Sequence, residues 1–297
     1  MKAQILDGKI VALKIQKRLK QEIQQLQIKY QARPKLVSLQ IKNNEGTDSY
    51  IKVQKELAHS LGINYKLYLL DKAAEDELIK KIRDFNKDEN ITAIIILLPL
   101  PEQIQTLRIL KEVSWKKDVE GLHPTNLGRL LYRDSRIAKH HHDYHDFAVP
   151  CTVSAVMELL NSAGLKTERD FKGKDIVIVG HSEIVGKPLA SLLLDKLATV
   201  TVCHVGTKNL KEYIEKAEVL ISATGKPNLI KGRWIKNGAI VIDVGMSKVG
   251  NKITGDVEFE EAKKHASFIT PVPGGVGPLT VTMLMNNVVK LFKLQKK

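Results

Sequence analysis

The chain has 297 residues, of which 43% are hydrophobic and 27% charged, and 47 basic against 33 acidic residues give a formal net charge of +14. This length and composition fit a globular protein with two domains of ordinary size, and they exclude a disordered chain. The longest apolar run, residues 93–100, is too short to cross a bilayer, and charges interrupt the amino terminus, so we expect a cytoplasmic protein without membrane contact.

The basic charge has two interpretations. Lysines are scattered along the chain and no nucleic-acid motif accompanies them, which favours a solvated lysine-rich surface over a specific nucleic-acid interface. Non-specific binding to nucleic acid stays open as a remoter class of function. The only two cysteines, Cys151 and Cys203, are distant in sequence, and we expect both to be reduced and structural.

Hydrophobic periodicity predicts an α/β fold for the first half of the chain. In chain order, the expected elements are a helix over 9–30, a strand over 36–41, a helix over 49–61, a strand over 63–70, a helix over 75–85 and a strand over 93–97. The last strand is apolar without alternation, as in a buried parallel sheet. The β-α-β-α-β order therefore predicts a parallel sheet with right-handed crossovers.

The same alternation starts again further along the chain. After a helix over 152–165, we expect strands over 176–179, 199–203, 219–223 and 239–243, with helices over 184–196 and 210–216 between them. The pattern predicts a second α/β unit. An apolar run over 281–290 predicts a buried helix near the carboxyl terminus.

A histidine-rich segment over 139–146 lies between the two predicted units. It contains His140, His141, His142, Asp143, His145 and Asp146. These side chains could bind a metal ion, but nothing in the sequence fixes their geometry. A solvated loop is the favoured interpretation, and we expect no metal site.

Two glycine-containing segments are candidate binding loops. Residues 269–280 combine prolines and glycines that leave peptide groups open to a ligand, although a tight turn before a helix is the alternative. In the other, strand 176–179 runs into Gly180, Ser182 and Gly186 and then a helix, as in turns that bind a pyrophosphate. The spacing is not G-x-G-x-x-G, and a ligand-free turn is the alternative, but the alternation that follows favours a dinucleotide.

Short motifs along almost the whole chain carry a family resemblance. They are Tyr50 at the start of a helix, Leu98 to Pro101, Lys117 to Pro124, Gly180-x-Ser182 with Val185-Gly186, Ala223 to Pro227, Ile242 to Gly245, Gly255 to Val257 and Pro271 to Pro278. In this order they resemble the methylenetetrahydrofolate dehydrogenase/methenyltetrahydrofolate cyclohydrolase family, the FolD proteins.

The resemblance implies an α/β fold with two domains in a homodimer. Residues 1–146 and 279–297 would form a parallel-sheet folate-binding catalytic domain, and residues 147–278 a Rossmann-like NAD(P)-binding domain. It also implies oxidation of 5,10-methylenetetrahydrofolate to the methenyl form with NADP or NAD, followed by hydrolysis to 10-formyltetrahydrofolate.

The resemblance also implies the site residues. The catalytic positions are Tyr50, Gln54 and Glu120. Substrate binding is implied for Tyr50, Leu97, Leu98, Pro99, Glu120, Pro271, Gly274 and Gly275. Cofactor binding is implied for Gly180, His181, Ser182, Val185, Gly186, Val205, Thr207, Thr224 and Gly225.

Three of these side chains differ from the family pattern. Gln54 stands where the family has the lysine that handles protons, Leu97 replaces a glutamine that tunes it, and Glu120 replaces an aspartate that holds the pterin. An amide cannot titrate near neutrality, and Lys55 lies about 100° further round the helix. Hydride transfer mainly needs orientation, so we expect dehydrogenation to remain and hydrolysis to be weak or absent. The alternative is a non-catalytic folate-binding paralogue or partner subunit.

The cofactor positions leave the choice of dinucleotide open. His181 and Val205 stand where NADP-using members have an arginine and a serine near the 2′-phosphate, which weakens phosphate recognition. No acidic residue follows the strand over 199–203 to bind the ribose of NAD. Both NADP and NAD therefore remain candidates.

Overall fold

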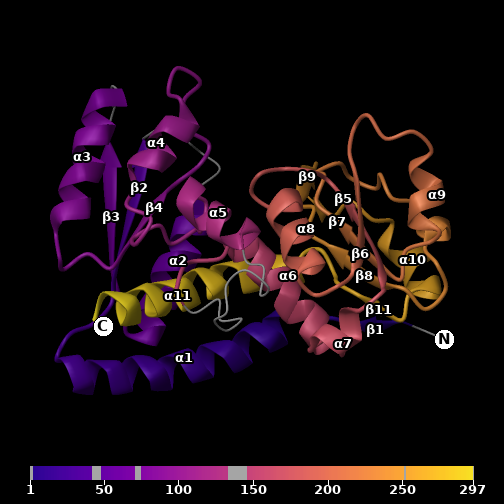
Figure 1. Cartoon of the computed structure of the whole chain (residues 1–297), viewed down its shortest axis with the longest axis horizontal. Helices are drawn as coiled ribbons and strands as arrows, with labels where there is room; N and C mark the ends of the chain where they lie inside the picture. The colour runs from indigo at the N-terminus through magenta and orange to yellow at the C-terminus, as the bar shows by residue number, and fades with distance from the viewer. Residues whose placement is uncertain (1–2, 42–47, 71–74, 133–145, 251, 297) are drawn as a thin grey trace. The chain divides into compact units, whose positions relative to one another are not determined.

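The structure is a computed structural model that describes residues 3–41, 48–70, 75–132, 146–250 and 252–296 (Figure 1). It contains two compact units. Unit 1 comprises Met1–Leu13 and Thr152–Thr280, and unit 2 comprises Lys14–Cys151 and Val281–Lys297. The histidines of the segment 139–146 lie outside the described residues.

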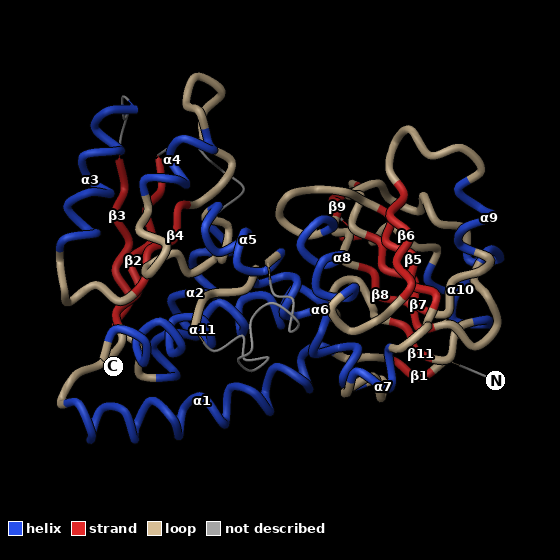
Figure 2. The backbone as a smooth tube through the Cα atoms, viewed as in Figure 1, coloured by secondary structure: helices blue, strands red, loops and turns tan. Residues whose placement is uncertain are grey.

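Unit 2 is built on a three-stranded parallel sheet with the strand order β3-β2-β4. The strands are β2 (Lys35–Ile41), β3 (Asn64–Leu70) and β4 (Ala93–Ile96), and Figure 2 shows them side by side. The helices of the unit are α2 (Asp48–Leu61), α3 (Glu75–Lys87), α4 (Thr106–Glu112), α5 (Pro124–Leu131) and most of α1 (Gly8–Tyr30) and α11 (Val276–Gln295). The parallel arrangement confirms the prediction for this half of the chain.

Apolar side chains at helical spacing bind α3 to this sheet. Its buried residues Leu78, Ile79, Ile82 and Phe85 lie in one core cluster with the apolar side chains of β2 and β4. Burying each such side chain stabilises the fold by about 2 kcal/mol. The acidic residues in the first turn of α3 further stabilise the helix, because the amino end of a helix dipole is positive. The core therefore holds the carboxyl end of β4 in a fixed place.

Unit 1 contains a six-stranded sheet with the order β1-β11-β8-β7-β5-β6, whose paired strands are all parallel. These strands are β1 (Gln4–Ile5), β5 (Asp175–Val179), β6 (Thr199–Cys203), β7 (Val219–Ser222), β8 (Ile240–Asp243) and β11 (Phe268–Ile269). A separate antiparallel pair is formed by β9 (Ser247–Val249) and β10 (Lys252–Thr254).

The sheet of unit 1 is accompanied by short helices, and α8 packs on β5 and β6. The helices are α6 (Cys151–Ser162), α7 (Glu168–Phe171), α8 (Gly186–Leu194), α9 (Leu210–Ile214), α10 (Phe259–His265) and the 3-10 helix η1 (Gly232–Trp234). Among the described residues, none of the helices combines the length and apolarity needed to cross a bilayer.

The structure differs from the predicted domain boundaries at the amino terminus. Residues 1–13 belong to unit 1, although we predicted them in the catalytic domain. The reason is β1, which pairs in parallel with β11, and Leu6 N extends the pairing with a 2.8 Å hydrogen bond to Ile269 O. A strand of two residues is too short to produce a recognisable alternation in sequence.

The carboxyl-terminal helix is longer than predicted. Helix α11 (Val276–Gln295) begins inside the glycine and proline segment rather than after it. Its Asn287 side chain donates hydrogen bonds to the carbonyl oxygens of Val119 (2.8 Å) and Val149 (2.9 Å). These bonds hold α11 against the backbone of unit 2 at Val119 and Val149.

Candidate active site

Helix α2 places Tyr50 and Gln54 one turn apart on one face of the helix. Gln54 is fully buried, together with Ile51, Ala58 and Leu61. Lys55 is exposed, as expected for the next position round the helix. Lys52, between Tyr50 and Gln54, is exposed as well, so neither lysine of this turn lies on the buried face.

The Gln54 amide is held from the sheet side by two hydroxyl groups. Ser38 Oγ, on β2, donates a hydrogen bond of 3.2 Å to Gln54 Oε1, and Tyr65 OH, on β3, approaches the same oxygen at 3.5 Å. Gln54 Nε2 is buried and has no hydrogen-bond partner among the described residues. Leaving a buried donor unpaired costs about 1–3 kcal/mol, so this nitrogen is suited to meet an acceptor on a ligand.

Leu97 directly follows β4 and is almost completely buried, with 3% of its surface exposed. Its backbone nitrogen continues the sheet with a 3.0 Å hydrogen bond to Leu39 O. The side chain is apolar and offers no hydrogen bond to Gln54. The next two residues are joined by a cis peptide bond, with Leu98 half-buried and Pro99 exposed.

Glu120 lies in the same neighbourhood as Tyr50. Burial of its carboxyl group, with a smaller contribution from the negative charge of Asp118, raises the pKa of Glu120 to about 8. Burial also raises the pKa of the Tyr50 hydroxyl, and the charge of Glu120 adds to that rise. Tyr50 and Glu120 are therefore electrostatically coupled, with Gln54 one helical turn from Tyr50, and the tyrosine stays protonated.

Asp118 shapes the turn that presents Glu120. Its carboxylate accepts hydrogen bonds from Gly121 N (3.1 Å), His123 N (2.8 Å) and Asn126 Nδ2 (2.8 Å). Gly121 has a φ of 71°, and a Cβ atom there would lie 2.6 Å from the Val149 carbonyl carbon. Only glycine fits this left-handed, crowded position, so the backbone next to Glu120 is closely constrained.

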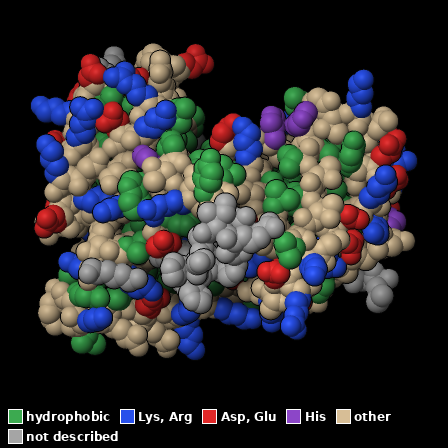
Figure 3. Space-filling view, in the orientation of Figure 1, with side chains coloured by type: hydrophobic (Ala, Val, Ile, Leu, Met, Phe, Trp, Pro, Cys, Tyr) green, Lys and Arg blue, Asp and Glu red, His purple; other side chains and the backbone are tan. Residues whose placement is uncertain are grey.

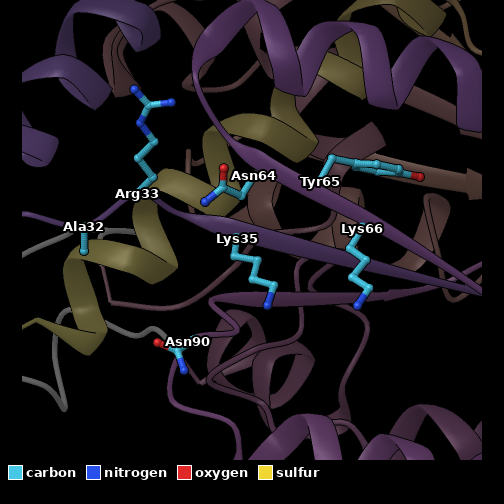
Figure 4. Close-up of a pocket in the computed structure, with 7 residues that line it drawn as sticks. All are labelled: Ala32, Arg33, Lys35, Asn64, Tyr65, Lys66 and Asn90. Atoms are coloured by element: carbon cyan, nitrogen blue, oxygen red, sulfur yellow. The ribbon is translucent and has the colours of Figure 1, made fainter.

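A separate pocket opens at the amino ends of β2 and β3 in unit 2 (Figure 4). It is lined by Ala32, Arg33, Lys35, Asn64, Tyr65, Lys66 and Asn90. In Figure 4 the Lys35 and Lys66 side chains point the same way, while the Tyr65 ring points away from them. The lining does not include Tyr50, Gln54 or Glu120, but Tyr65, which lines the pocket, also approaches Gln54.

In unit 1, the turn between β5 and α8 offers bare backbone. Gly180 has a φ of 123°, and its nitrogen donates a 2.8 Å hydrogen bond to Cys203 O. A Cβ atom on Gly186 would collide with the Gly180 carbonyl group, and one on Gly180 would collide with Ala223. Val185 N donates a 3.2 Å hydrogen bond to Ser182 Oγ. The turn therefore has the close strand-to-helix packing that a pyrophosphate site requires.

The buried carboxylate of Asp256 supports the segment of Thr224 and Gly225, which the sequence predicts to bind the cofactor. Asp256 Oδ2 accepts hydrogen bonds from Ser222 Oγ (2.8 Å) and Thr224 N (2.7 Å), which fixes the end of β7. Gly225 follows with a φ of 64° and is exposed. Nearby Asp243 has its pKa raised to about 7, chiefly by burial.

The loop after β6 carries the remaining cofactor candidates. Val205 is 89% exposed, and Thr207 Oγ1 accepts a 2.8 Å hydrogen bond from His204 N. The rings of His204 and His181 lie 5.1 Å apart. Sequence reasoning did not single out His204, although its place directly after β6 was a usable signal.

Pro271, Gly274 and Gly275 belong to unit 1 and pack at the start of α1. Gly274 has a φ of 112°, and its carbonyl oxygen accepts a 3.0 Å hydrogen bond from Gly8 N. A Cβ atom on Gly8 would collide with the carbonyl group of Gly275. The prolines and glycines therefore allow close packing within unit 1, and at least one of their peptide groups is already hydrogen-bonded there.

Together, the two parallel sheets and the glycine turn define a two-domain α/β protein of the dinucleotide-binding class. Residues 6–120 match the catalytic domain of the tetrahydrofolate dehydrogenase/cyclohydrolase family, and residues 150–296 match its NAD(P)-binding domain. The chain is 42% identical to "Bifunctional protein FolD" of Bacillus subtilis (strain 168), with 99% of each chain covered. It therefore belongs to the tetrahydrofolate dehydrogenase/cyclohydrolase family.

Solved structures agree with this assignment. The bifunctional FolD enzyme of Campylobacter jejuni has a TM-score of 0.90 and 39% identity, covering 98% of this chain and 99% of that one. The Trypanosoma brucei FolD enzyme, complexed with NADP cofactor and inhibitor, has a TM-score of 0.91 and 35% identity, covering 99% and 98%. The resemblance found in the sequence is confirmed.

Proposed function

We propose that this protein oxidises 5,10-methylenetetrahydrofolate to 5,10-methenyltetrahydrofolate with NADP or NAD, and that it hydrolyses the methenyl product weakly or not at all. Membership of the family supports the oxidation. The single observation that carries the second part is the fully buried Gln54 amide in the position of the family's lysine.

Hydride transfer places few demands on the side chains of this protein. A bound dinucleotide would supply the hydride acceptor, and the turn from Gly180 to Gly186, where Cβ atoms would collide with backbone, fits its phosphates. The protein must mainly hold the folate in a reactive orientation. We assign this task to the Tyr50 ring, the Glu120 carboxyl group, the residues Leu97 to Pro99 and the loop from Pro271 to Gly275.

Hydrolysis places a demand that Gln54 cannot meet. Water that adds to the methenyl carbon loses a proton, and the folate nitrogen released when the ring opens gains one. A lysine of suitable pKa can accept and return a proton, whereas the Gln54 amide can only donate or accept a hydrogen bond. Leu97 adds no polar group, so we propose that the cluster orients the folate without moving a proton at this position.

A second candidate function is folate binding without turnover, in a paralogue or partner subunit. The unpartnered Gln54 Nε2 favours binding of a polar ligand and does not by itself require chemistry. We also propose, from the family, a homodimer that resides in the cytoplasm, with unit 2 as the folate-binding catalytic domain and unit 1 as the NAD(P)-binding domain.

One set of assays with purified full-length protein tests the proposal. Absorbance of the methenyl product is followed after methylenetetrahydrofolate is mixed with NADP or with NAD, and methenyltetrahydrofolate hydrolysis is measured separately against the uncatalysed rate. Oxidation with slow hydrolysis is the expected result. Folate binding without oxidation would favour the non-catalytic function, and efficient hydrolysis would contradict the role given to Gln54.

A further inference from the structure

A single buried amide on α11 holds two segments of unit 2 that are far apart in the sequence. Asn287 has 1% of its surface exposed. Its Nδ2 atom donates hydrogen bonds of 2.8 Å to Val119 O and 2.9 Å to Val149 O, and Cys151 Sγ lies 3.5 Å from the same nitrogen. An amide nitrogen carries two hydrogen atoms, so the two carbonyl groups use both of them.

The first of these carbonyl groups belongs to the residue that precedes Glu120. Val119 N donates a 3.4 Å hydrogen bond to Ile94 O, and Ile94 N donates a 2.8 Å hydrogen bond to Lys117 O, so this segment runs beside β4. Val119 is therefore held by β4 through its N–H group and by α11 through its carbonyl group. The two bonds fix the backbone from which the Glu120 side chain extends.

The backbone after Glu120 packs on the second segment that Asn287 holds. A Cβ atom on Gly121 would lie 2.6 Å from the Val149 carbonyl carbon and 2.7 Å from Ala148 O. The same Val149 carbonyl group accepts the second hydrogen bond of Asn287. Glu120 is thus flanked on both sides by backbone whose position depends on one side chain.

The charged and titratable groups around Glu120 leave burial as the main influence on it. Among the described residues, those that couple to it are Asp118 in its own loop, Tyr50 on α2 and Cys151 at the start of α6. The cation Lys290, on α11, couples to Cys151. Burial is the largest cause of the raised pKa of Glu120, and burial depends on how tightly this loop packs.

We propose that Asn287 is a positioning residue for folate binding, because its two hydrogen bonds hold the Glu120 side chain where it meets the substrate. This rests on the folate-binding role proposed for Glu120. Asn287 acts through the backbone at Val119 and Val149 and does not itself touch the folate. Without the amide, both buried carbonyl groups lose their donor, which favours a shift of the loop or the entry of water.

Calorimetric titration of the full chain with tetrahydrofolate, kept under reductant, tests this role through Asn287→Leu, which has a similar shape and no donor. At about pH 9 the carboxyl group is ionised in both proteins, and we expect the variant to bind about tenfold more weakly. The affinity of the unmodified protein should rise as the pH increases towards about 8. In the variant this rise should occur about one pH unit lower, because the carboxyl group is less buried.

The conditions separate this effect from general attraction and from damage to unit 1. Lysine and arginine side chains are spread over the visible surface, and the net charge is +14, so titrations are made at an ionic strength of about 0.15 M (Figure 3). Comparison at equal pH cancels the ionisation of the ligand. Binding of 5′-AMP should be equal in the two proteins, because Asn287 belongs to unit 2.

Two further variants complete the test. Val288→Ala, at the next buried position of α11, removes packing and no donor, and it should lower the melting temperature without changing folate affinity or its pH profile. If Asn287→Leu does not fold, Asn287→Gln replaces it: the displaced amide should weaken folate binding by about threefold.

A folded Asn287 variant with the affinity and pH profile of the unmodified protein would overturn the proposal. The same loss and the same shift in Val288→Ala would also overturn it, because packing and not the hydrogen bonds would then be responsible. Absence of tetrahydrofolate binding by the unmodified protein would instead contradict the proposed function on which this role rests.

Discussion

Ser38 Oγ donates a 3.2 Å hydrogen bond to Gln54 Oε1 and so joins β2 to α2 through the residue that we propose stands in the position of the family's lysine. With Oε1 also approached by Tyr65 OH, the amide has a defined orientation and Nε2 is its unpaired donor. A lysine ammonium group has no acceptor atom, so at this position it would instead donate hydrogen bonds to the Ser38 and Tyr65 hydroxyl groups, which can also accept them. The surroundings of residue 54 therefore hold the amide in place and could also receive a lysine.

Introducing the missing base should restore hydrolysis. We expect Gln54→Lys to raise the rate of methenyltetrahydrofolate hydrolysis by about 100-fold, which is at the lower end of what a positioned acid–base group contributes. Oxidation of methylenetetrahydrofolate should change much less, because it needs no titrating group at residue 54. The double variant Gln54→Lys/Leu97→Gln should exceed the single one, since the glutamine gives the lysine a hydrogen-bonding partner.

The neighbouring lysine provides the control for this experiment. Lys55→Gln removes a charge from the exposed face of the same helix, and we expect both rates to stay unchanged. An equal loss of hydrolysis in Lys55→Gln would mean that Lys55 and not residue 54 handles the proton. A hydrolysis rate that Gln54→Lys leaves unchanged, in a folded variant that still oxidises its substrate, would contradict the assignment of residue 54.

The Glu120 carboxyl group should make stability fall as the pH rises. Its pKa is raised from the ordinary value of 4.5 to about 8, so the folded protein holds a proton there that the unfolded chain has released. The stabilisation is complete below about pH 4.5 and is lost as the pH rises towards about 8. We expect Glu120→Gln to increase the free energy of unfolding by about 2 kcal/mol at pH 9, and by much less at pH 5.

Denaturant unfolding at the two pH values measures this effect, with Glu102→Gln, at an exposed position of unit 2, as the control. Under the proposed role of Glu120, Glu120→Gln should also weaken tetrahydrofolate binding, because one of the two terminal atoms of an amide cannot accept a hydrogen bond. A pH dependence identical to that of the unmodified protein would show that the Glu120 carboxyl group ionises normally.

Replacing Asp256 should weaken cofactor binding and leave folate binding unchanged. Asp256→Ala leaves Ser222 Oγ and Thr224 N without their acceptor, which should destabilise unit 1 by about 2–3 kcal/mol and release the segment that carries Gly225. We expect the KM for NADP or NAD to rise by about tenfold, with tetrahydrofolate binding unchanged. Ser222→Ala removes one of the two hydrogen bonds and should have a smaller effect of the same kind. If Asp256→Ala weakened folate binding and cofactor binding equally, Asp256 would not act on the cofactor site alone, and this prediction would be wrong.

The turn before α8 should not tolerate a side chain at Gly186. Gly186→Ala places a Cβ atom against the Gly180 carbonyl group, so the turn must open and dinucleotide binding should fall by at least about tenfold. Gly128→Ala, inside α5, is the matched control because an added Cβ meets no atom within 4 Å, and it should stabilise the helix by about 0.5–1 kcal/mol. Normal binding of 5′-AMP by Gly186→Ala would argue against a phosphate site in this turn.

Sequence patterns predicted the long elements of the fold well, because periodic apolar residues report which side of an element is buried. The strand over 199–203 appears with the same limits as β6, and the helix expected over 9–30 is α1. The short strands β1 and β11 escaped prediction, since two residues carry no period. The two strands pair with each other from opposite ends of the chain, and this pairing places residues 1–13 in unit 1.

The site was predictable only in part, for a similar reason. The spacing of Tyr50 and Gln54 on one helix face followed from helical geometry, and the burial of Gln54 and partial burial of Tyr50 agree with it. The contributions of Ser38 and Tyr65 depend on where β2 and β3 pass the helix, which no local pattern reports. The pairing of His181 with His204 likewise results from strand register and could not be found from either motif alone.

The most direct test of the account is the ratio of the two rates for the purified protein: oxidation of methylenetetrahydrofolate, with NADP and with NAD, and hydrolysis of methenyltetrahydrofolate. We expect the methenyl compound to accumulate during oxidation, because Gln54 does not move a proton to or from water. Hydrolysis that keeps pace with oxidation, so that 10-formyltetrahydrofolate forms without methenyl accumulation, would contradict the central claim.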